Sequence, residues 1–149
     1  MLVNIRRVPF IPSSWENIQT IVELANPKLS EKIADLGSGD GRIVVEFARR
    51  GFEAHGYEID EDLIIESEAK ILNQGLDDLA FIHWKSYWEE DLSPYDIITI
   101  YGMSSIMGKL EEKLRNELVK GSRVVSNIFL FPNWKPKSEK NNAYLYVVE

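Results

Sequence analysis

The sequence has no cysteine among its 149 residues. A disulfide scaffold, a zinc site built on thiolates and a cysteine nucleophile are therefore excluded. Only two histidines are present, so a metal site would need mostly carboxylate ligands, and we expect no metal. No apolar run approaches the roughly 20 residues of a membrane-spanning helix. The lack of cysteine also fits a reducing compartment, and we expect a cytoplasmic protein with no membrane segment.

Basic residues are scarce as well, with 17 Lys+Arg against 24 Asp+Glu and a formal charge of −7. The imbalance lies in residues 51–100, where 13 acidic residues face only Lys70 and Lys85. A chain of this charge lacks the broad basic surface with which proteins hold nucleic-acid phosphates. Nucleic acid is therefore not the expected partner. Most of the acidic excess is predicted to lie on a solvated helix face, and a negative surface near a binding pocket would attract lysine-rich segments.

The length predicts one domain over residues 1–149. Strands are predicted at 32–36, 53–59, 79–83, 95–101, 123–129 and 144–148. Helices are predicted at 13–25, 42–50, 60–73 and 105–119, the first opened by the capping-box pair Ser13 and Glu16. This alternation predicts an α/β fold, a Rossmann-like doubly wound and mostly parallel sheet of six to seven strands with helices on both faces. The last strand follows no helix, so we expect it to be antiparallel.

A glycine-rich loop, Asp35-Leu36-Gly37-Ser38-Gly39-Asp40-Gly41-Arg42, joins the first strand to the next helix. A tight turn could account for some of these glycines, but three at alternate positions also let a ligand approach the backbone. A dinucleotide fingerprint would need glycine at position 42, and no Gly-Lys-Ser/Thr follows for a phosphate-binding loop. The pattern D-x-G-x-G-x-G resembles motif I of class I S-adenosylmethionine-dependent methyltransferases.

Two further positions fit this cofactor. Glu58 ends the second strand, where a carboxylate can accept hydrogen bonds from both ribose hydroxyls; a solvated strand end is the alternative. Ser86 follows the third strand, where such enzymes place an adenine partner, and Tyr87 could pack on the adenine ring. Trp84, Tyr87 and Trp88 could equally be core aromatics that anchor the loop.

The end of the fourth strand limits the chemistry. It reads Ile100-Tyr101-Gly102-Met103 and not [DN]-P-P-[FYW], the signature of adenine-amine enzymes. Carbon-5 pyrimidine methylation needs the cysteine that this chain lacks. A protein or small-molecule substrate remains.

The resemblance extends over most of the chain. It rests on the segments Val8-Pro9-Phe10-Ile11-Pro12-Ser13, Gly56-Tyr57-Glu58-Ile59-Asp60, Lys109-Leu110-Glu111-Glu112-Lys113-Leu114 and Phe131-Pro132-x-Trp134-x-Pro136, together with the glycine loop. They resemble the small seven-strand protein-lysine methyltransferases, which comprise archaeal broad-specificity enzymes and the mitochondrial enzymes that act on a lysine of ATP synthase, in its membrane-ring c protein. The chain departs from the archaeal members at Lys137–Asn142, where they insert a further strand, so we expect a shortened sheet edge.

The resemblance implies methylation of lysine-bearing protein substrates, with residues 1–27 forming a cofactor-covering segment and helix. Ser13 would then lie near the methionine carboxylate, and Tyr101, Phe131 and Trp134 would border the acceptor pocket. Tyr101 and Trp134 are the catalytic candidates, Tyr101 as the residue that orients the amine, and no essential general base is expected. Cofactor contacts are predicted for Pro12, Ser13, Asp35, Gly37, Ser38, Gly39, Asp40, Glu58, Ile59, Ser86, Tyr87 and Tyr101. A small-molecule methyltransferase and a cofactor-binding protein without turnover are the alternatives, and a monomer is expected.

Overall fold

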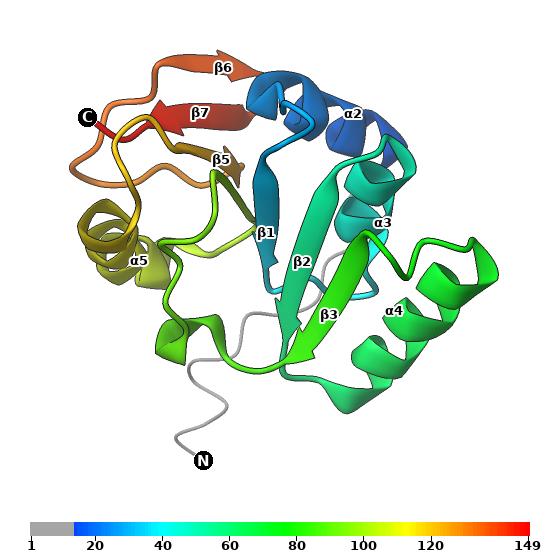
Figure 1. Ribbon diagram of the computed structural model, residues 1–149. Helices are drawn as coiled ribbons and strands as arrows, with labels where there is room; N and C mark the ends of the chain where they lie inside the picture. The colour runs from blue at the N-terminus through cyan, green and yellow to red at the C-terminus, as the bar shows by residue number, and fades with distance from the viewer. Residues whose placement is uncertain (1–13) are drawn as a thin grey trace.

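The computed structural model, which describes residues 14–149, is built around a seven-stranded sheet with the order β3-β2-β1-β4-β5-β7-β6 (Figure 1). The strands are β1 (Lys32–Leu36), β2 (Glu53–Glu58), β3 (Ala80–Trp84), β4 (Ile97–Ile100), β5 (Arg123–Asn127), β6 (Ser138–Lys140) and β7 (Ala143–Val147). The first five pair in parallel, and β7 is antiparallel to both β5 and β6. The predicted mostly parallel sheet with an antiparallel last strand is confirmed.

Helices cover both faces of the sheet, as predicted. Helices α2 (Trp15–Ala25), α3 (Arg42–Arg49) and α4 (Glu61–Asn73) bury their apolar residues against one face, and α5 (Ser104–Glu117) packs on the other (Figure 1). The chain adds β2 and β3 on one side of β1 and later adds β4 and β5 on the other. Ligands of doubly wound sheets bind at the carboxyl ends of the strands where the order reverses, here between β1 and β4.

The start of α2 differs from the prediction by one residue. Ser14 is the N-cap, and its hydroxyl accepts a hydrogen bond of 3.2 Å from the backbone amide of Asn17. The capping pair Ser13 and Glu16 was therefore misplaced, because the extended residue that precedes the first helical turn is Ser14. Ser13 and the rest of the predicted entry segment lie outside the described residues.

The expected shortening of the sheet edge is wrong in one respect, because a seventh strand is present. Strand β6 has three residues and joins β7 through Asn141 and Asn142, which have φ angles of 50° and 63°. Two consecutive left-handed residues form the tight turn whose twist suits a two-residue hairpin, and asparagine tolerates this conformation. The hairpin therefore gives β6 a register on β7 despite its shortness.

One region of the sheet lacks a helix. The side chains of β2 and β3 on the α5 side are covered by the segment between β3 and β4, which contains only the short helix η1 (Tyr87–Glu89). His55 lies here with its Nδ1 2.9 Å from Nε2 of His83 and its Nε2 2.7 Å from a carboxylate oxygen of Glu53. Both histidines are therefore engaged in a hydrogen-bonded chain across the two strands.

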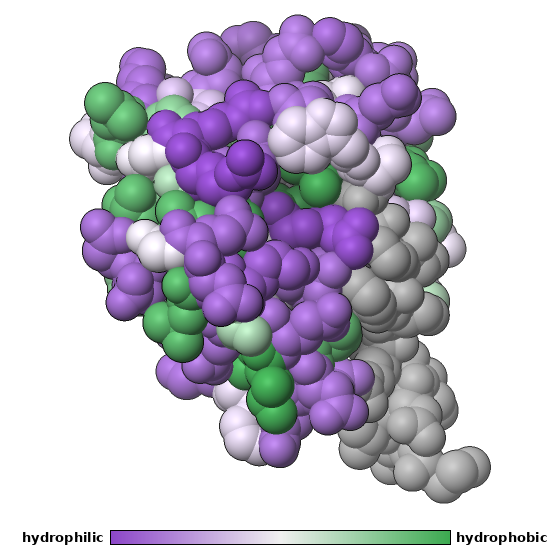
Figure 2. Space-filling view, turned by 90° about the vertical axis from the view of Figure 1, so that its right-hand side faces the viewer, coloured by the Kyte–Doolittle hydropathy of each residue, from purple (hydrophilic) through white to green (hydrophobic). Residues whose placement is uncertain are grey.

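The side of the molecule formed by α4 is largely hydrophilic, as the space-filling view in Figure 2 shows. The charged residues of α4 at positions 61, 62, 66 and 68 are exposed. This arrangement confirms that part of the acidic excess lies on a solvated helix face. The helices of residues 14–149 are all too short or too polar to span a bilayer.

Candidate active site

The predicted site residues that the structure describes lie mainly at one edge of the sheet. Because β1 to β5 are parallel, their carboxyl ends meet at this edge, and the register pairs Leu36 with Tyr57 and with Ile100. The glycine loop after β1 therefore lies between Glu58 at the end of β2 and Tyr101 after β4. The topology thus brings together three features that span more than 60 residues of the sequence.

Asp35 lies at the end of β1 and is almost fully buried. The hydroxyl of Thr99, its register partner on β4, donates a 2.8 Å hydrogen bond to Asp35 Oδ1. Burial raises the pKa of Asp35 to about 7, helped by the charges of Glu58 and Asp40, while the hydrogen bond from Thr99 opposes the rise. A cation near this carboxylate would stabilise its charged form. Thr99 was not predicted, although it is the one polar residue in the strand Ile97–Ile100.

The glycine loop is shaped for close approach of a ligand. The φ angle of Gly37 is 76°, and a side chain at this position would meet no atom within 4 Å, so the backbone faces open space. Gly41 has a different role, because an added Cβ would lie 2.9 Å from the hydroxyl oxygen of Ser67 on α4. The hydroxyl of Ser38 is buried with no hydrogen-bond partner in the described part of the chain. Gly37 and Ser38 therefore leave free space and an unused polar atom at the loop.

Glu58 organises the loop from the neighbouring strand. One of its carboxylate oxygens accepts a 2.8 Å hydrogen bond from the backbone amide of Gly39. The other accepts hydrogen bonds of 2.9 Å from the amides of Ile59 and Asp60. Each carboxylate oxygen can accept more than one hydrogen bond, so ribose hydroxyls can be bound without loss of the loop contacts. The assignment of Glu58 to the cofactor stays a prediction, now joined by this role in the loop.

The side chain of Asp40 turns away from the edge. It accepts hydrogen bonds of 3.0 Å and 2.6 Å from Arg42, and Lys70 lies 3.3 Å away. Burial would raise the pKa of Asp40, but the hydrogen bonds and charges of Arg42 and Lys70 outweigh it and hold the pKa below its ordinary value. The carboxylate therefore fastens the loop to α3 and α4, which leaves the backbone of Asp40 for a ligand.

The segments after β2 and β3 form the side of the site predicted to bind the nucleoside. Ile59 is exposed, and its carbonyl accepts a 3.2 Å hydrogen bond from the indole of Trp84. Ser86 caps η1 by accepting a hydrogen bond from the amide of Trp88. Tyr87 packs against the core and is half-buried, and this burial raises its pKa to about 12. Ser86 and Tyr87 thus follow β3 as predicted, and their contacts with adenine stay predictions.

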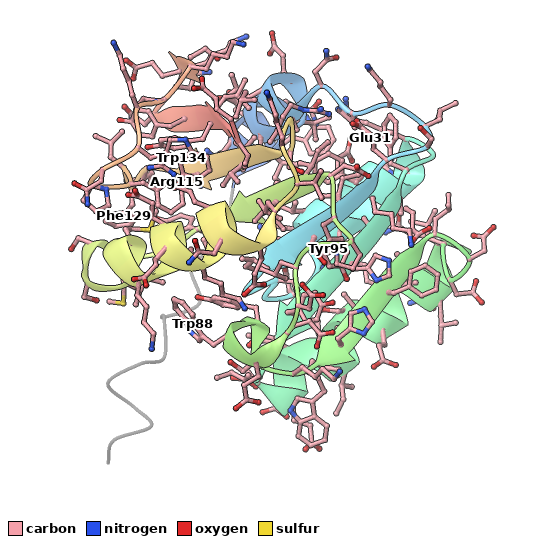
Figure 3. All side chains as sticks on the ribbon, turned by 60° about the vertical axis from the view of Figure 1, so that its left-hand side comes forward. Glu31, Trp88, Tyr95, Arg115, Phe129 and Trp134 are labelled. Atoms are coloured by element: carbon pink, nitrogen blue, oxygen red, sulfur yellow. The ribbon has the colours of Figure 1, made fainter. Side chains whose placement is uncertain are left out.

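Two separate aromatic groups follow β4 and β5 (Figure 3). Tyr101 is half-buried, and its ring centroid lies 6.2 Å from that of Phe129. Trp134 instead contacts Phe131 and Tyr146, at centroid distances of 5.4 Å and 4.9 Å, and the guanidinium of Arg115 lies 5.3 Å from its ring. Core packing therefore accounts for Phe131 and Trp134, and their role at the acceptor stays a prediction.

The chain makes a strained turn directly after β5. Ile128 has a φ angle of 73°, and the amide of Phe129 donates a 2.9 Å hydrogen bond to the carbonyl of Asn127. Such γ-turns are rare, and this conformation costs a β-branched residue about 1–3 kcal/mol. The turn is held by reciprocal amide hydrogen bonds of 2.9 Å and 2.7 Å between Asn17 on α2 and Asn127. No local sequence pattern predicts it, because asparagine or glycine would be expected at position 128.

The described residues fit S-adenosylmethionine. Asp35 and Glu58 supply carboxylates for an ammonium group and a ribose, and the loop supplies the open backbone at Gly37 and the unpartnered hydroxyl of Ser38. The predicted contacts of Pro12 and Ser13 lie outside the described residues. The site thus provides acceptors for a cationic nucleoside at the switch point of the sheet.

Comparisons with known proteins agree with this geometry. Residues 35–138 match the family model of the ANTKMT methyltransferase domain. The chain is 31% identical to a protein-lysine N-methyltransferase of Saccharolobus islandicus, over 95% of this chain and 94% of that protein. It is 34% identical to a human lysine N-methyltransferase named for ATP synthase, over 87% of this chain and 55% of that protein. The chain thus spans little more than half the length of the vertebrate relatives that it matches.

A solved structure is also similar over nearly the whole fold. It is described as an RNA methyltransferase from Salinibacter ruber in complex with S-adenosyl-L-homocysteine. The TM-score is 0.86 at 31% sequence identity, and the alignment covers 93% of this chain and 92% of that one. A demethylated product of the cofactor is therefore bound in a protein of the same architecture.

Proposed function

Since the chain belongs to the ANTKMT methyltransferase domain family and its cofactor is S-adenosylmethionine, we propose that it transfers a methyl group to the side-chain amine of lysine in proteins. The observation that carries the proposal is the meeting of Asp35, the glycine loop and Glu58 at one edge of the sheet. It supports a methyltransferase site, and the relatives named as protein-lysine N-methyltransferases support lysine as the acceptor.

We assign the cofactor to named groups of this chain. Glu58 accepts hydrogen bonds from the ribose, the backbone at Gly37 approaches the methionine part, and the Asp35 carboxylate balances its ammonium charge. When bound, the cofactor supplies a methyl group on a positively charged sulfur, which is already an activated leaving group. The protein therefore contributes alignment more than acid–base chemistry.

The acceptor amine must lose a proton before it can react. Deprotonating a lysine with a pKa of about 10.4 at pH 7 requires about 4.6 kcal/mol. A partly dry pocket beside a positive charge lowers this pKa by desolvation and repulsion. Tyr101 lies at the edge beside the glycine loop, where its hydroxyl can orient the amine, and water can remove the proton. This assignment needs no general base.

RNA is a second candidate acceptor because one similar structure is described as an RNA methyltransferase. The formal charge of −7 and the 13 acidic residues within 51–100 oppose the binding of a polyanion. The acidic chain favours a cationic acceptor, so we place protein lysine first. A small-molecule acceptor is the third candidate.

The test is a transfer assay with S-adenosylmethionine labelled in its methyl group. The purified protein is incubated separately with a mixture of proteins, with total RNA and with a small-molecule extract. We expect label in protein, with methylated lysine after hydrolysis, and none of it with the Glu58→Ala variant. Label confined to RNA or to small molecules would contradict lysine as the acceptor.

A further inference from the structure

The strained turn at Ile128 has no counterpart in the packing of the fold. Its side chain is 46% exposed, so little apolar area is buried in return for a φ angle of 73°. Asparagine or glycine adopts this conformation with less strain and would close the same turn. A strained backbone that keeps an exposed apolar side chain therefore points to a contact outside the chain.

The turn lies next to the proposed acceptor position. Strand β5 pairs in parallel with β4 and Ser126 lies opposite Ile100, so the residues that follow, Tyr101 and Asn127, emerge side by side. Phe129 faces Tyr101, and Leu130 on its other side is also exposed, at 52%. The side chains of Ile128 and Leu130 thus flank the residue that contacts Tyr101.

The surroundings of the turn are uncharged. The segments 101–108 and 128–134, which follow β4 and β5, contain no Asp, Glu, Lys or Arg. The acidic residues after β2 begin at Glu58, three strand positions away in the order β2-β1-β4-β5, which is about 14 Å at the usual strand spacing. A lysine-rich segment would find no carboxylate partner beside Tyr101, whereas an apolar one would find Ile128 and Leu130.

We infer that Ile128 and Leu130 form a specificity contact for an apolar side chain adjacent to the target lysine. The substrate class is then a protein segment in which a single lysine is flanked by apolar residues, and not a cluster of lysines. This inference rests on the proposed function and deepens it. The strain at Ile128 holds its side chain toward the acceptor, where a less strained asparagine would offer no apolar surface.

The test uses two short peptides of equal length and equal charge, each with one central lysine. Apolar residues flank the lysine in one peptide and serines in the other. We expect the wild-type protein to methylate the apolar peptide with a kcat/KM about tenfold higher, the usual size of a discrimination based on a few methylene groups. Ile128→Asn and Ile128→Gly should reduce this ratio toward one, mainly by slowing the apolar peptide.

Three controls make the result specific. Both variants should melt at the same or a higher temperature than the wild type, because each accepts the left-handed conformation. Leu72→Asn removes an apolar side chain that is 65% exposed on α4, away from this edge, and should leave the ratio unchanged. The Kd for S-adenosylmethionine should be the same in all four proteins.

Several outcomes would overturn the inference. Equal rates with both peptides in the wild type would contradict the apolar specificity alone, with lysine methylation intact. An unchanged ratio in the Ile128 variants, or a weaker Kd for S-adenosylmethionine with the ratio retained, would show that Ile128 serves the fold or the cofactor instead. Methylation of neither peptide, with no labelled lysine in the protein mixture, would contradict the proposed function as well.

Discussion

The hydroxyl of Thr99 donates a 2.8 Å hydrogen bond to the carboxylate of Asp35, which is buried at the point where the strand order reverses. A hydrogen bond to the charged form lowers a pKa, yet burial and the neighbouring charges of Glu58 and Asp40 still raise the pKa of Asp35 to about 7. The fold therefore keeps an incompletely compensated negative charge at the glycine loop. Binding of a cationic ligand at this position would compensate it.

Replacing Asp35 by asparagine should stabilise the protein and weaken cofactor binding. The pKa of Asp35 is raised from 3.8 to about 7 on folding, so the unfolded chain ionises first and stability falls as pH rises between these values. Asp35→Asn keeps an acceptor for Thr99 and should raise the free energy of unfolding at about pH 8 by roughly 1–4 kcal/mol. Urea denaturation at about pH 4 and about pH 8 measures the difference.

The same variant should bind S-adenosylmethionine more weakly at about pH 8, where the wild-type carboxylate is ionised. Asp78→Asn, an exposed carboxylate on the loop before β3, is the matched control and should change neither property. A variant that loses stability at high pH would contradict the assigned charge state of Asp35.

Glu58→Ala should weaken binding of S-adenosylmethionine by at least about tenfold, because hydrogen bonds to a charged group contribute about 1.5–3 kcal/mol. The loop amide of Gly39 also loses its acceptor, so the loss should exceed that of the ribose contacts alone. Isothermal titration calorimetry measures the Kd. Glu61→Ala, which removes an exposed charge from the first turn of α4, should bind normally. Undiminished binding by Glu58→Ala would show that the cofactor lies elsewhere.

The amide pair of Asn17 and Asn127 should couple α2 to the turn after β5. Asn127 is almost fully buried, so Asn127→Ala leaves the amide of Asn17 without its partner and should destabilise the protein by about 1–3 kcal/mol. Asn17→Ala should cost a similar amount, and the double variant should lose less than the two single losses combined. Chemical denaturation of the four proteins gives this coupling energy. Strictly additive losses would mean that the pair does not hold the turn.

The histidine chain should make the protein sensitive to acid. Burial and the neighbouring His55 lower the pKa of His83 from its ordinary value of 6.5. A lowered pKa in the folded state gives stability that is present above pH 6.5 and is lost as pH falls below it. His83→Asn should therefore lose less stability than the wild type between about pH 7 and about pH 5. Thermal unfolding across this range is the measurement, and an identical loss in both proteins would contradict it.

The strands and helices were largely predictable because most of them carry their own local signals. The glycine loop, the cap of α4 at Asp60 and Gly75 beyond its end have characteristic residues, and the structure has them as predicted. Strand β6 was missed because its three exposed residues have no apolar alternation, although Asn141-Asn142 is itself a hairpin signal. The first helix begins one residue later than predicted because Ser13 and Ser14 are both suitable caps.

The site was predictable only in part. Motif spacing indicated Asp35, the glycines and Glu58, because a nucleoside ligand requires those residue types at the ends of the first two strands. It did not reveal that Asp40 is bound to Arg42 and Lys70, or that Trp134 packs on Tyr146 in a group separate from Tyr101. Those contacts join segments that are distant in the chain or depend on how side chains turn, which no local pattern records.

The sequence by itself determined the kind of chemistry, since the missing cysteine excluded one class of methyl transfer and the glycine pattern indicated the cofactor. Only the tertiary structure decided the surroundings of the acceptor. Strand pairing placed the acidic residues after β2 at one side of the edge and the uncharged segments after β4 and β5 at the other. It also placed Asn127 against Asn17, which holds Ile128 in a conformation that its own preference opposes. Such a conformation arises from contacts across the fold, and therefore no stretch of sequence predicts it.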